Sequence, residues 1–262
     1  MAVKKTKKLS AQQLTTTVAS GETFLKVDAN GKVTRIDLPH LQSALFGGLD
    51  SRLMMDGIFI AYVSSETDTY ALAKPHDWPA LQNAGNEAYG VAIMDGDKWL
   101  VVALTESESP LPWSSSNKGL NSCQDDQPYF AWEGSTYTQQ IISHTASDNI
   151  TDTPSYAAGF CYHYEWESSQ GGAGVWEEQW YLPATAEMLM IYKHLYEINY
   201  CLSLISGATL ISTDSNYWTS VGISKTVGHY AYSFSFGKGL LERGYSQTTN
   251  LRVRPVTDLK IY

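Results

Sequence analysis

The sequence predicts an α+β domain preceded by a small N-terminal β-hairpin arm. Three observations lead to this fold class. Short strand-like runs fill the chain up to Leu104, helical patterns occupy residues 154–205, and strand-like alternation returns after Asn216. A length of 262 residues suits one large domain plus an arm. We therefore place the arm at residues 1–49 and the domain at residues 50–262.

The arm contains a complete hairpin pattern. A basic run at Lys4–Lys8 precedes a strand pattern at Thr23–Val27. An Asn-Gly turn, which tolerates positive φ, leads to a return strand at Lys32–Ile36, and Leu38–Leu45 is expected to form a short helix. These elements bury too little apolar area to fold alone. A partner must then stabilise the arm, unless the hairpin packs on its own domain.

The first half of the domain reads as strands. Gly57–Val63 and Tyr70–Ala73 have strand patterns, and Asp77–Pro79 is expected to lie in a loop. Gly90–Met94 and Lys98–Leu104 form a predicted hairpin about Asp95-Gly96-Asp97. The core candidates of this hairpin are Val91, Ile93, Leu100, Val102 and Leu104.

The middle of the domain is expected to be irregular and then helical. Pro110–Ala131 is rich in Ser, Pro, Asn and Asp, as irregular segments are. Pro154–Trp166 is predicted to be a helix with the proline in its first turn. A second helix is expected to begin with Thr185 as N-cap and Glu187 in the first turn. A short third helix follows and ends before Gly207.

The last stretch, residues 217–256, combines aromatic and hydroxyl side chains. Ala231–Phe236 alternates apolar and polar residues, Gly237–Gly239 turns the chain, and Arg252–Val256 alternates again. Rigid aromatic area with adaptable hydrogen-bonding groups is typical of binding surfaces. Two core strands joined by surface loops explain the pattern equally well.

Composition excludes several functional classes. The hydrophobic content is 43% and the charged content 17%, which is typical of a globular chain. The net charge of −9 disfavours nucleic acid as a partner. No stretch is long and apolar enough to insert into a membrane, and no signal peptide is recognisable. We expect a protein made in the cytoplasm without an export signal.

Motifs for metal binding and catalysis are missing from the sequence. Its three cysteines, Cys123, Cys161 and Cys201, are widely spaced, and no two histidines stand four residues apart. GxSxG and HExxH do not occur. Glu177 and Glu178 could form a carboxylate pair beside two tryptophans, but solvated charges explain them better. We expect no enzyme, no cofactor and no catalytic metal, and leave a structural calcium open.

The C-terminal stretch resembles a known family. Tyr217-Trp218-Thr219-Ser220, the Ala231–Phe236 strand, the glycine turn and Arg252–Val256 match, in order, the signature of the variable proteins of diversity-generating retroelements. Weaker matches are Trp180–Pro183, Ser155–Ala158 and Gly90–Ile93. Thr219 replaces the usual serine. The sugar-binding Gln-Pro-Asp triplet of animal lectins is missing, since Tyr129 follows Gln127-Pro128.

The resemblance implies a C-type-lectin-like domain of the formylglycine-generating-enzyme subtype. It further implies a receptor-binding protein of a phage tail, located in the virion, whose diversified surface binds a host-cell surface protein or glycan. The arm would then attach to other virion proteins and support a homo-oligomer, with a trimer favoured because weak contacts gain from multivalency. The alternative is a structural virion or cell-surface assembly module with a lectin-like fold and no diversified binding.

The resemblance also implies which residues form the variable region, about 217–256. In this family diversity concentrates in codons that begin with two adenines, mainly AAC and AAT, whose products exclude Trp, Lys, Glu, Gln and Met. Lys225, Lys238, Glu242 and Gln247 are therefore poor candidates. The expected ligand-binding residues, with Tyr232 and Tyr245 as aromatic anchors and Ser233 and Ser235 as polar contacts, are Val221, Ile223, Ser224, Val227, His229, Tyr232, Ser233, Ser235, Leu240, Leu241, Tyr245, Ser246, Thr249 and Asn250.

Overall fold

The computed structural model divides the chain into two units, Met1–Met54 and Met55–Tyr262. The sequence analysis places this boundary after Leu49. The structure describes residues 24–27, 33–36, 56–116, 128–143, 150–169, 173–223 and 230–259. The predicted helix at 38–45 and the candidate residues Ser224, Val227 and His229 lie outside these ranges.

The described part of the first unit is a β-hairpin. Strands β1 (Phe24–Val27) and β2 (Val33–Ile36) pair antiparallel, with Phe24 opposite Ile36 and Val27 opposite Val33. Both strands were predicted from the sequence.

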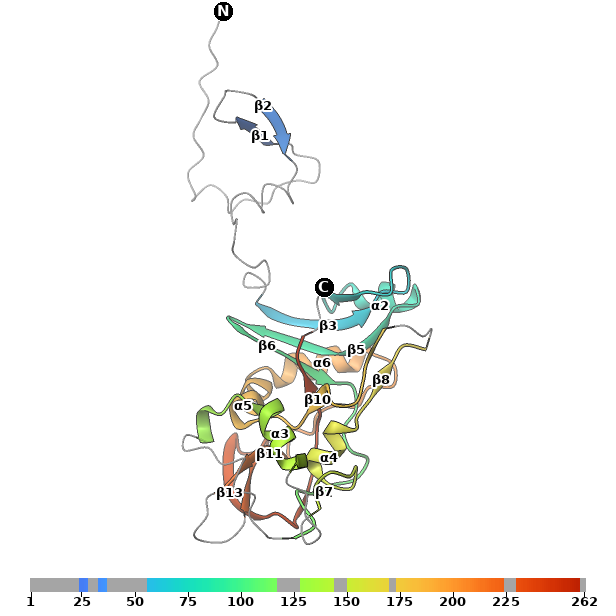
Figure 1. The fold of residues 1–262 in the computed structure, drawn as a ribbon. Coiled ribbons are helices and arrows are strands. Elements are labelled where there is room, and N and C mark those ends of the chain that lie inside the picture. The colour runs from blue at the N-terminus through green and yellow to red at the C-terminus, as the bar shows by residue number, and fades with distance from the viewer. Residues whose placement is uncertain are drawn as a thin grey trace, which may run out of the picture. The chain divides into compact units, whose positions relative to one another are not determined.

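The second unit contains a six-stranded sheet, which crosses the upper part of this unit in Figure 1. Its spatial order is β10-β15-β6-β5-β3-β4, and all neighbours pair antiparallel. The strands are β3 (Gly57–Val63), β4 (Tyr70–Ala73), β5 (Glu87–Asp95), β6 (Lys98–Ala103), β10 (Trp180–Tyr181) and β15 (Val256–Thr257).

The predicted hairpin of β5 and β6 is confirmed. Asp95 pairs with Lys98, and Gly96 takes φ +62° in the turn, a conformation that favours glycine. Four of the five predicted core residues, Val91, Ile93, Leu100 and Val102, are fully buried, while Leu104 is half-buried.

A three-stranded antiparallel sheet lies at the other end of the domain. Its order is β11 (Asn216–Gly222), β12 (Tyr230–Ser235) and β13 (Leu240–Ser246), so β12 is the central strand. Short ladders join β7 (Leu111–Pro112) to β14 (Asn250–Leu251) and β8 (Trp166–Glu167) to β9 (Gly174–Val175).

The expected strand at Arg252–Val256 is mostly irregular. Arg252 makes one isolated bridge to Tyr217, and regular pairing resumes only at Val256. Pro255 has no N–H to donate to a ladder, although its carbonyl accepts a hydrogen bond from Ala103 N at 3.0 Å.

The second unit also contains several helices. They are α2 (Trp78–Asn83), the 3₁₀ turn η3 (Pro128–Phe130), α3 (Gly134–Ser143), α4 (Ala157–Tyr162), α5 (Thr185–Lys193) and α6 (Leu195–Leu204). Helix α6 packs on β3 and β5, whereas α5 packs on β12 (Figure 1). Their shared core joins Ile60, Val91 and Ile198 to Phe234 and Phe236.

Three helix predictions need correction. Trp78 and Pro79 begin helix α2 instead of lying in a loop, because proline fits a first helical turn and Trp78 is buried against the core. Helix α4 begins at Ala157, since residues before it form a turn in which Tyr156 N donates to Thr153 O at 3.0 Å. It ends at Tyr162, and Trp166 already belongs to β8.

The start of α5 also differs from the prediction. Ala184 is the N-cap and Thr185 is the first helical residue. Glu187 lies in the first turn, as predicted, and it also caps the helix, because its Oε2 accepts a hydrogen bond from Ala184 N at 2.6 Å. Glu187 also accepts from Gly134 N, which ties the starts of α3 and α5 together.

The observed architecture is α+β, which agrees with the predicted fold class. The described ranges contain no helix whose length and hydropathy would let it cross a membrane.

Candidate binding face on the C-terminal sheet

The β11–β13 sheet has buried aromatic side chains on both faces, with Tyr217, Phe234 and Phe236 on one face and Trp218 on the other. Tyr217, Trp218, Phe234 and Phe236 are each exposed by no more than 4%. Phe234 and Phe236 pack against Tyr192 of α5 with ring centroids 5.1 and 5.8 Å apart. Trp218 Nε1 donates to Leu111 O at 2.8 Å. Residues that the family signature assigns to the scaffold are thus buried here.

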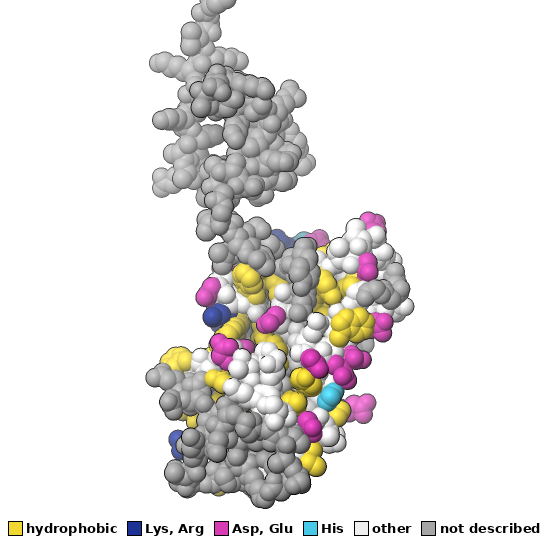
Figure 2. Space-filling model, viewed as in Figure 1, with side chains coloured by type: hydrophobic (Ala, Val, Ile, Leu, Met, Phe, Trp, Pro, Cys, Tyr) yellow, Lys and Arg dark blue, Asp and Glu magenta, His cyan; other side chains and the backbone are white. Residues whose placement is uncertain are grey.

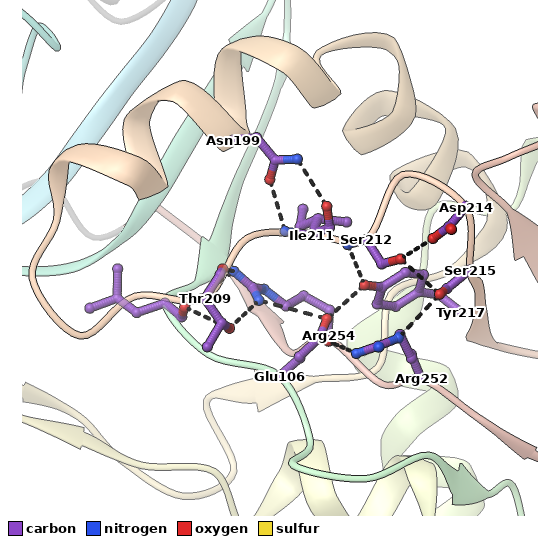
Figure 3. A network of polar contacts seen from close by, with 11 residues as sticks. Glu106, Asn199, Thr209, Ile211, Ser212, Asp214, Ser215, Tyr217, Arg252 and Arg254 are labelled. Atoms are coloured by element: carbon purple, nitrogen blue, oxygen red, sulfur yellow. Dashed lines mark hydrogen bonds and ion pairs between the residues drawn. The ribbon is translucent and has the colours of Figure 1, made fainter.

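A polar network fixes the sheet to the rest of the domain (Figure 3). Tyr217 Oη donates to Glu106 Oε2 at 2.6 Å, and the other carboxylate oxygen binds Arg252. Arg254, 1% exposed, lies 3.8 Å from Glu106 and donates to the backbone oxygens of Thr209 and Leu104. Burial raises the pKa of Tyr217, and the bond to Glu106 adds to this rise, so the phenol stays protonated.

The face of the sheet that carries Trp218 also carries a polar bridge across the central strand. Asn216 Nδ2, on β11, donates to Glu242 Oε2 at 2.9 Å and to Tyr245 Oη at 2.8 Å, both on β13. Because β12 lies between these strands, the bonded side chains must pass over it. Ser233 is the register partner of both Trp218 and Glu242, so it lies beneath this bridge.

Four predicted contact residues are buried, and for them the prediction of an exposed face is wrong. Ser233 and Ser235 are 0% and 2% exposed, since the β11 and β13 side chains close over β12. Tyr232 points to the other side of the sheet, where it packs with Val221, Ala131 and Ala184. A fully buried Val221 and a 6% exposed Tyr232 therefore belong to the core.

Seven other candidates reach the surface, and all but Ile223, which directly follows β11, lie on β13 and the segment after it. Leu240 is 56% exposed, and Asn250 is also exposed. The remaining five are half-buried, and they are Ile223, Leu241, Tyr245, Ser246 and Thr249.

Sequence reasoning missed the residues that organise this face. Asn216 precedes the signature, and Glu242 was set aside because its codon is unsuited to diversification. Lys238 Nζ binds Glu242 Oε1 at 2.7 Å. The Lys238 bond is the main cause of the lowered pKa of Glu242, and the Glu242 bond raises the pKa of Tyr245. An i, i+4 charge pair and an Asn at the strand start were the available signals.

Among the described residues, no cluster of three or more His, Cys, Asp or Glu could hold a metal ion. Cys161 and Cys201 are buried free thiols, and burial raises the pKa of both. A thiol kept protonated in this way is a poor nucleophile.

Comparison with known proteins adds little. No family model and no curated protein matches the sequence. A fimbrial protein from Bacteroides ovatus of known structure is similar over 61% of this chain, with 14% sequence identity and a TM-score of 0.39. The chain spans about a third of that protein's length, 35% of it. A similarity this low does not assign a fold family or a function.

Proposed function

We propose that this chain is a ligand-recognition protein whose second unit is a C-type-lectin-like domain of the formylglycine-generating-enzyme subtype. In this proposal it is the receptor-binding protein of a phage tail. Its C-terminal sheet binds a protein or glycan on the host-cell surface, and its N-terminal arm contacts other virion proteins.

The observation that carries the proposal is the separation of buried and exposed residues on the C-terminal sheet. Signature residues Tyr217, Trp218 and Arg254 are buried and tied to neighbouring elements by hydrogen bonds. Residues between them on β13, above all Leu240, reach solvent. A rigid support beneath a changeable surface is what a recognition protein requires, because a substitution on the surface then leaves folding intact.

The predicted contact residues that reach the surface also suit recognition. Tyr245 offers a half-exposed ring, held edge-on to Trp218 at a centroid distance of 6.4 Å. Such a fixed aromatic ring provides contact area at low entropic cost. Asn250 and Thr249 add adjustable hydrogen-bonding groups beside it.

Binding to whole cells tests the proposal. Fluorescently labelled full-length protein is applied to a panel of bacterial strains, and bound fluorescence is measured by flow cytometry. We expect saturable binding to some strains and loss of that binding in the double variant Leu240→Asp, Asn250→Asp. The matched control is Leu210→Asp, because Leu210 is 52% exposed in the loop after α6 and lies outside the sheet.

Two results would contradict the proposal. One is equal binding by the wild type and the double variant. The other is binding to no strain together with self-assembly into filaments, which would favour a structural assembly module.

A further inference from the structure

A groove lies at the other end of the domain from β13, beside α2 and β8 (Figure 1). Its volume is about 430 Å³, within the range of small-molecule sites, roughly 300–1,000 Å³. A smaller cavity of about 240 Å³ shares Gly85 and Glu87 with it. We call the two together the β5 groove, because Glu87 at the start of β5 lies at their junction.

Part of the lining of the β5 groove is apolar. Trp78, Leu104, Ile205 and Trp166 line it. The Trp166 ring is half-buried, and its position is fixed by the buried ring of Tyr89 at a centroid distance of 5.7 Å. An indole held in this way presents a rigid apolar surface to a ligand.

The lining also contains a polar side chain, Gln82, whose direction is fixed by hydrogen bonds. Gln82 Oε1 accepts from Trp78 Nε1 at 3.1 Å and from Ser206 N at 3.3 Å. The amide oxygen is thereby identified, and the NH₂ end of Gln82 remains as a donor.

Two carboxylates, Glu87 and Glu167, also line the groove. Glu87 accepts from Ser169 N at 2.7 Å and from the Ser169 hydroxyl. Burial raises the pKa of Glu87, but the Ser169 hydrogen bonds outweigh this effect and lower it, so the group is ionised at neutral pH. Glu167 on β8 is exposed. Each carboxylate can accept further hydrogen bonds, since its two oxygens offer about four acceptor sites.

The charge of the groove excludes acidic ligands. No Lys, Arg or His occurs among the described residues that line its two cavities, whereas Asp68, Glu87 and Glu167 do. Acidic side chains also stand beside hydrophobic ones over much of the face shown in Figure 2. A phosphate, sulfate or sialic acid would meet like charge here.

We propose that the β5 groove binds a neutral saccharide, with a sugar ring stacked on Trp166 and its hydroxyls bonded to Glu87, Glu167 and Gln82. Sugar hydroxyls donate to carboxylates and accept from an amide NH₂, and the C–H face of the ring covers an indole. The site is separate from the C-terminal sheet and does not depend on the function proposed for it.

A glycan array followed by calorimetry tests this proposal. Full-length protein is applied to an array of neutral glucose-, galactose-, mannose- and N-acetylglucosamine-containing oligosaccharides and their sialylated forms. The strongest neutral binder is then titrated into four variants. We expect about tenfold weaker binding for Trp166→Ala, which loses roughly 1.4 kcal/mol of stacking. Glu167→Gln should weaken binding severalfold without affecting the fold, because Glu167 is exposed.

Two variants serve as controls. Trp176→Ala removes a 40% exposed tryptophan outside the groove, and Leu240→Asp alters the C-terminal sheet. Both should bind the saccharide like the wild type. The proposal is overturned if only sialylated glycans bind, if no glycan binds, or if Glu167→Gln and Trp166→Ala bind as tightly as the wild type. Equal loss in Leu240→Asp would place the sugar on the C-terminal sheet instead.

Discussion

Asn216 Nδ2 donates a hydrogen bond to Tyr245 Oη at 2.8 Å, although the two residues lie on the outer strands of a three-stranded sheet. This bond brings Tyr245 over the central strand and against the edge of Trp218. It decides which residues of β12 meet solvent. Tyr245 therefore has two roles, as part of the surface and as part of the cover over Ser233.

Trp218→Ala should destabilise the domain more than Tyr245→Ala. Trp218 is fully buried and its indole N–H is bonded to Leu111 O, so its loss leaves a cavity and an unpaired carbonyl. The expected cost is about 3–5 kcal/mol. Tyr245 is half-buried, so its removal leaves less empty volume. Thermal unfolding followed by circular dichroism compares the two. A lower melting temperature for Tyr245→Ala than for Trp218→Ala would mean that Tyr245 belongs to the core and Trp218 to the surface.

The elements that could be predicted from the sequence are those whose whole pattern lies within one short stretch of the chain. The β5–β6 hairpin has two apolar runs about a glycine turn, and β1, β2, β3 and β4 have short alternating or apolar runs. Helix α3 was missed because Gly134–Ser143 is rich in Thr, Ser and Gln, which give no apolar stripe. Tertiary contacts stabilise it as a helix, namely its packing against β11, α4 and β10 and the bond between Gly134 and Glu187.

The candidate site was predicted in part, and the errors have one cause. Alternation in Ala231–Phe236 indicates which residues share a face, and it places Phe234 and Phe236 correctly on the core side. It cannot show that a second layer of side chains covers the other face. That cover depends on Asn216, which is 29 residues from Tyr245 in sequence, and such a contact leaves no local signal.

Removing the carboxylate of Glu106 should destabilise the domain strongly. Its side chain is 8% exposed and is the only acidic partner found for Arg254 among the described residues. Without it, a guanidinium that is 1% exposed stays charged and unpaired in the core. Glu106→Ala is expected to cost about 3–5 kcal/mol. Urea unfolding measures the difference, with the exposed Glu108→Ala as control. A cost below that of the control would show that the network contributes nothing.

Stability should fall as pH rises because of Glu187. Burial raises the pKa of this carboxyl to about 8, and Asp258 and Glu133 add to the rise, against the backbone bonds from Ala184 and Gly134. The folded state therefore holds a proton that the unfolded chain releases near pH 4.5. Between these two values the free energy of unfolding should decline by up to about 1.4 kcal/mol per pH unit.

The variant Glu187→Gln isolates this effect. It keeps an oxygen that can accept from Ala184 N but cannot ionise. The difference in unfolding free energy between the wild type and the variant should change between pH 5 and pH 8. As pH rises, the wild type should become less stable relative to the variant. A constant difference over that interval would show that Glu187 is ionised throughout.

The full-length protein is expected to be a homotrimer or larger. The arm hairpin has too little core to fold alone, and weak surface contacts gain affinity when several copies act together. Light scattering coupled to size-exclusion chromatography measures the mass directly. A mass of 29.0 kDa at high protein concentration would identify a monomer and contradict this expectation.

The final prediction concerns where natural variants differ. If the locus is diversified as in the family it resembles, substitutions should gather at the surface positions of the C-terminal sheet and the segment after it. We expect them at Leu240, Tyr245, Asn250 and their neighbours. Ser233 and Ser235 should stay small, although their codons are compatible with the same route, because both are buried under the Asn216 bridge. A larger residue there would overpack the site at a cost of about 1–3 kcal/mol.

Sequencing this locus across related phage tests that pattern. The informative comparison is between exposed and buried positions that share the same codon type, since the copying mechanism treats them alike and only folding separates them. Substitutions that are as frequent at Ser233 as at Leu240 would show that the bridge does not constrain the sheet. Substitutions spread evenly along the chain would contradict the proposed recognition function itself, because a changeable surface would then have no advantage over the scaffold beneath it.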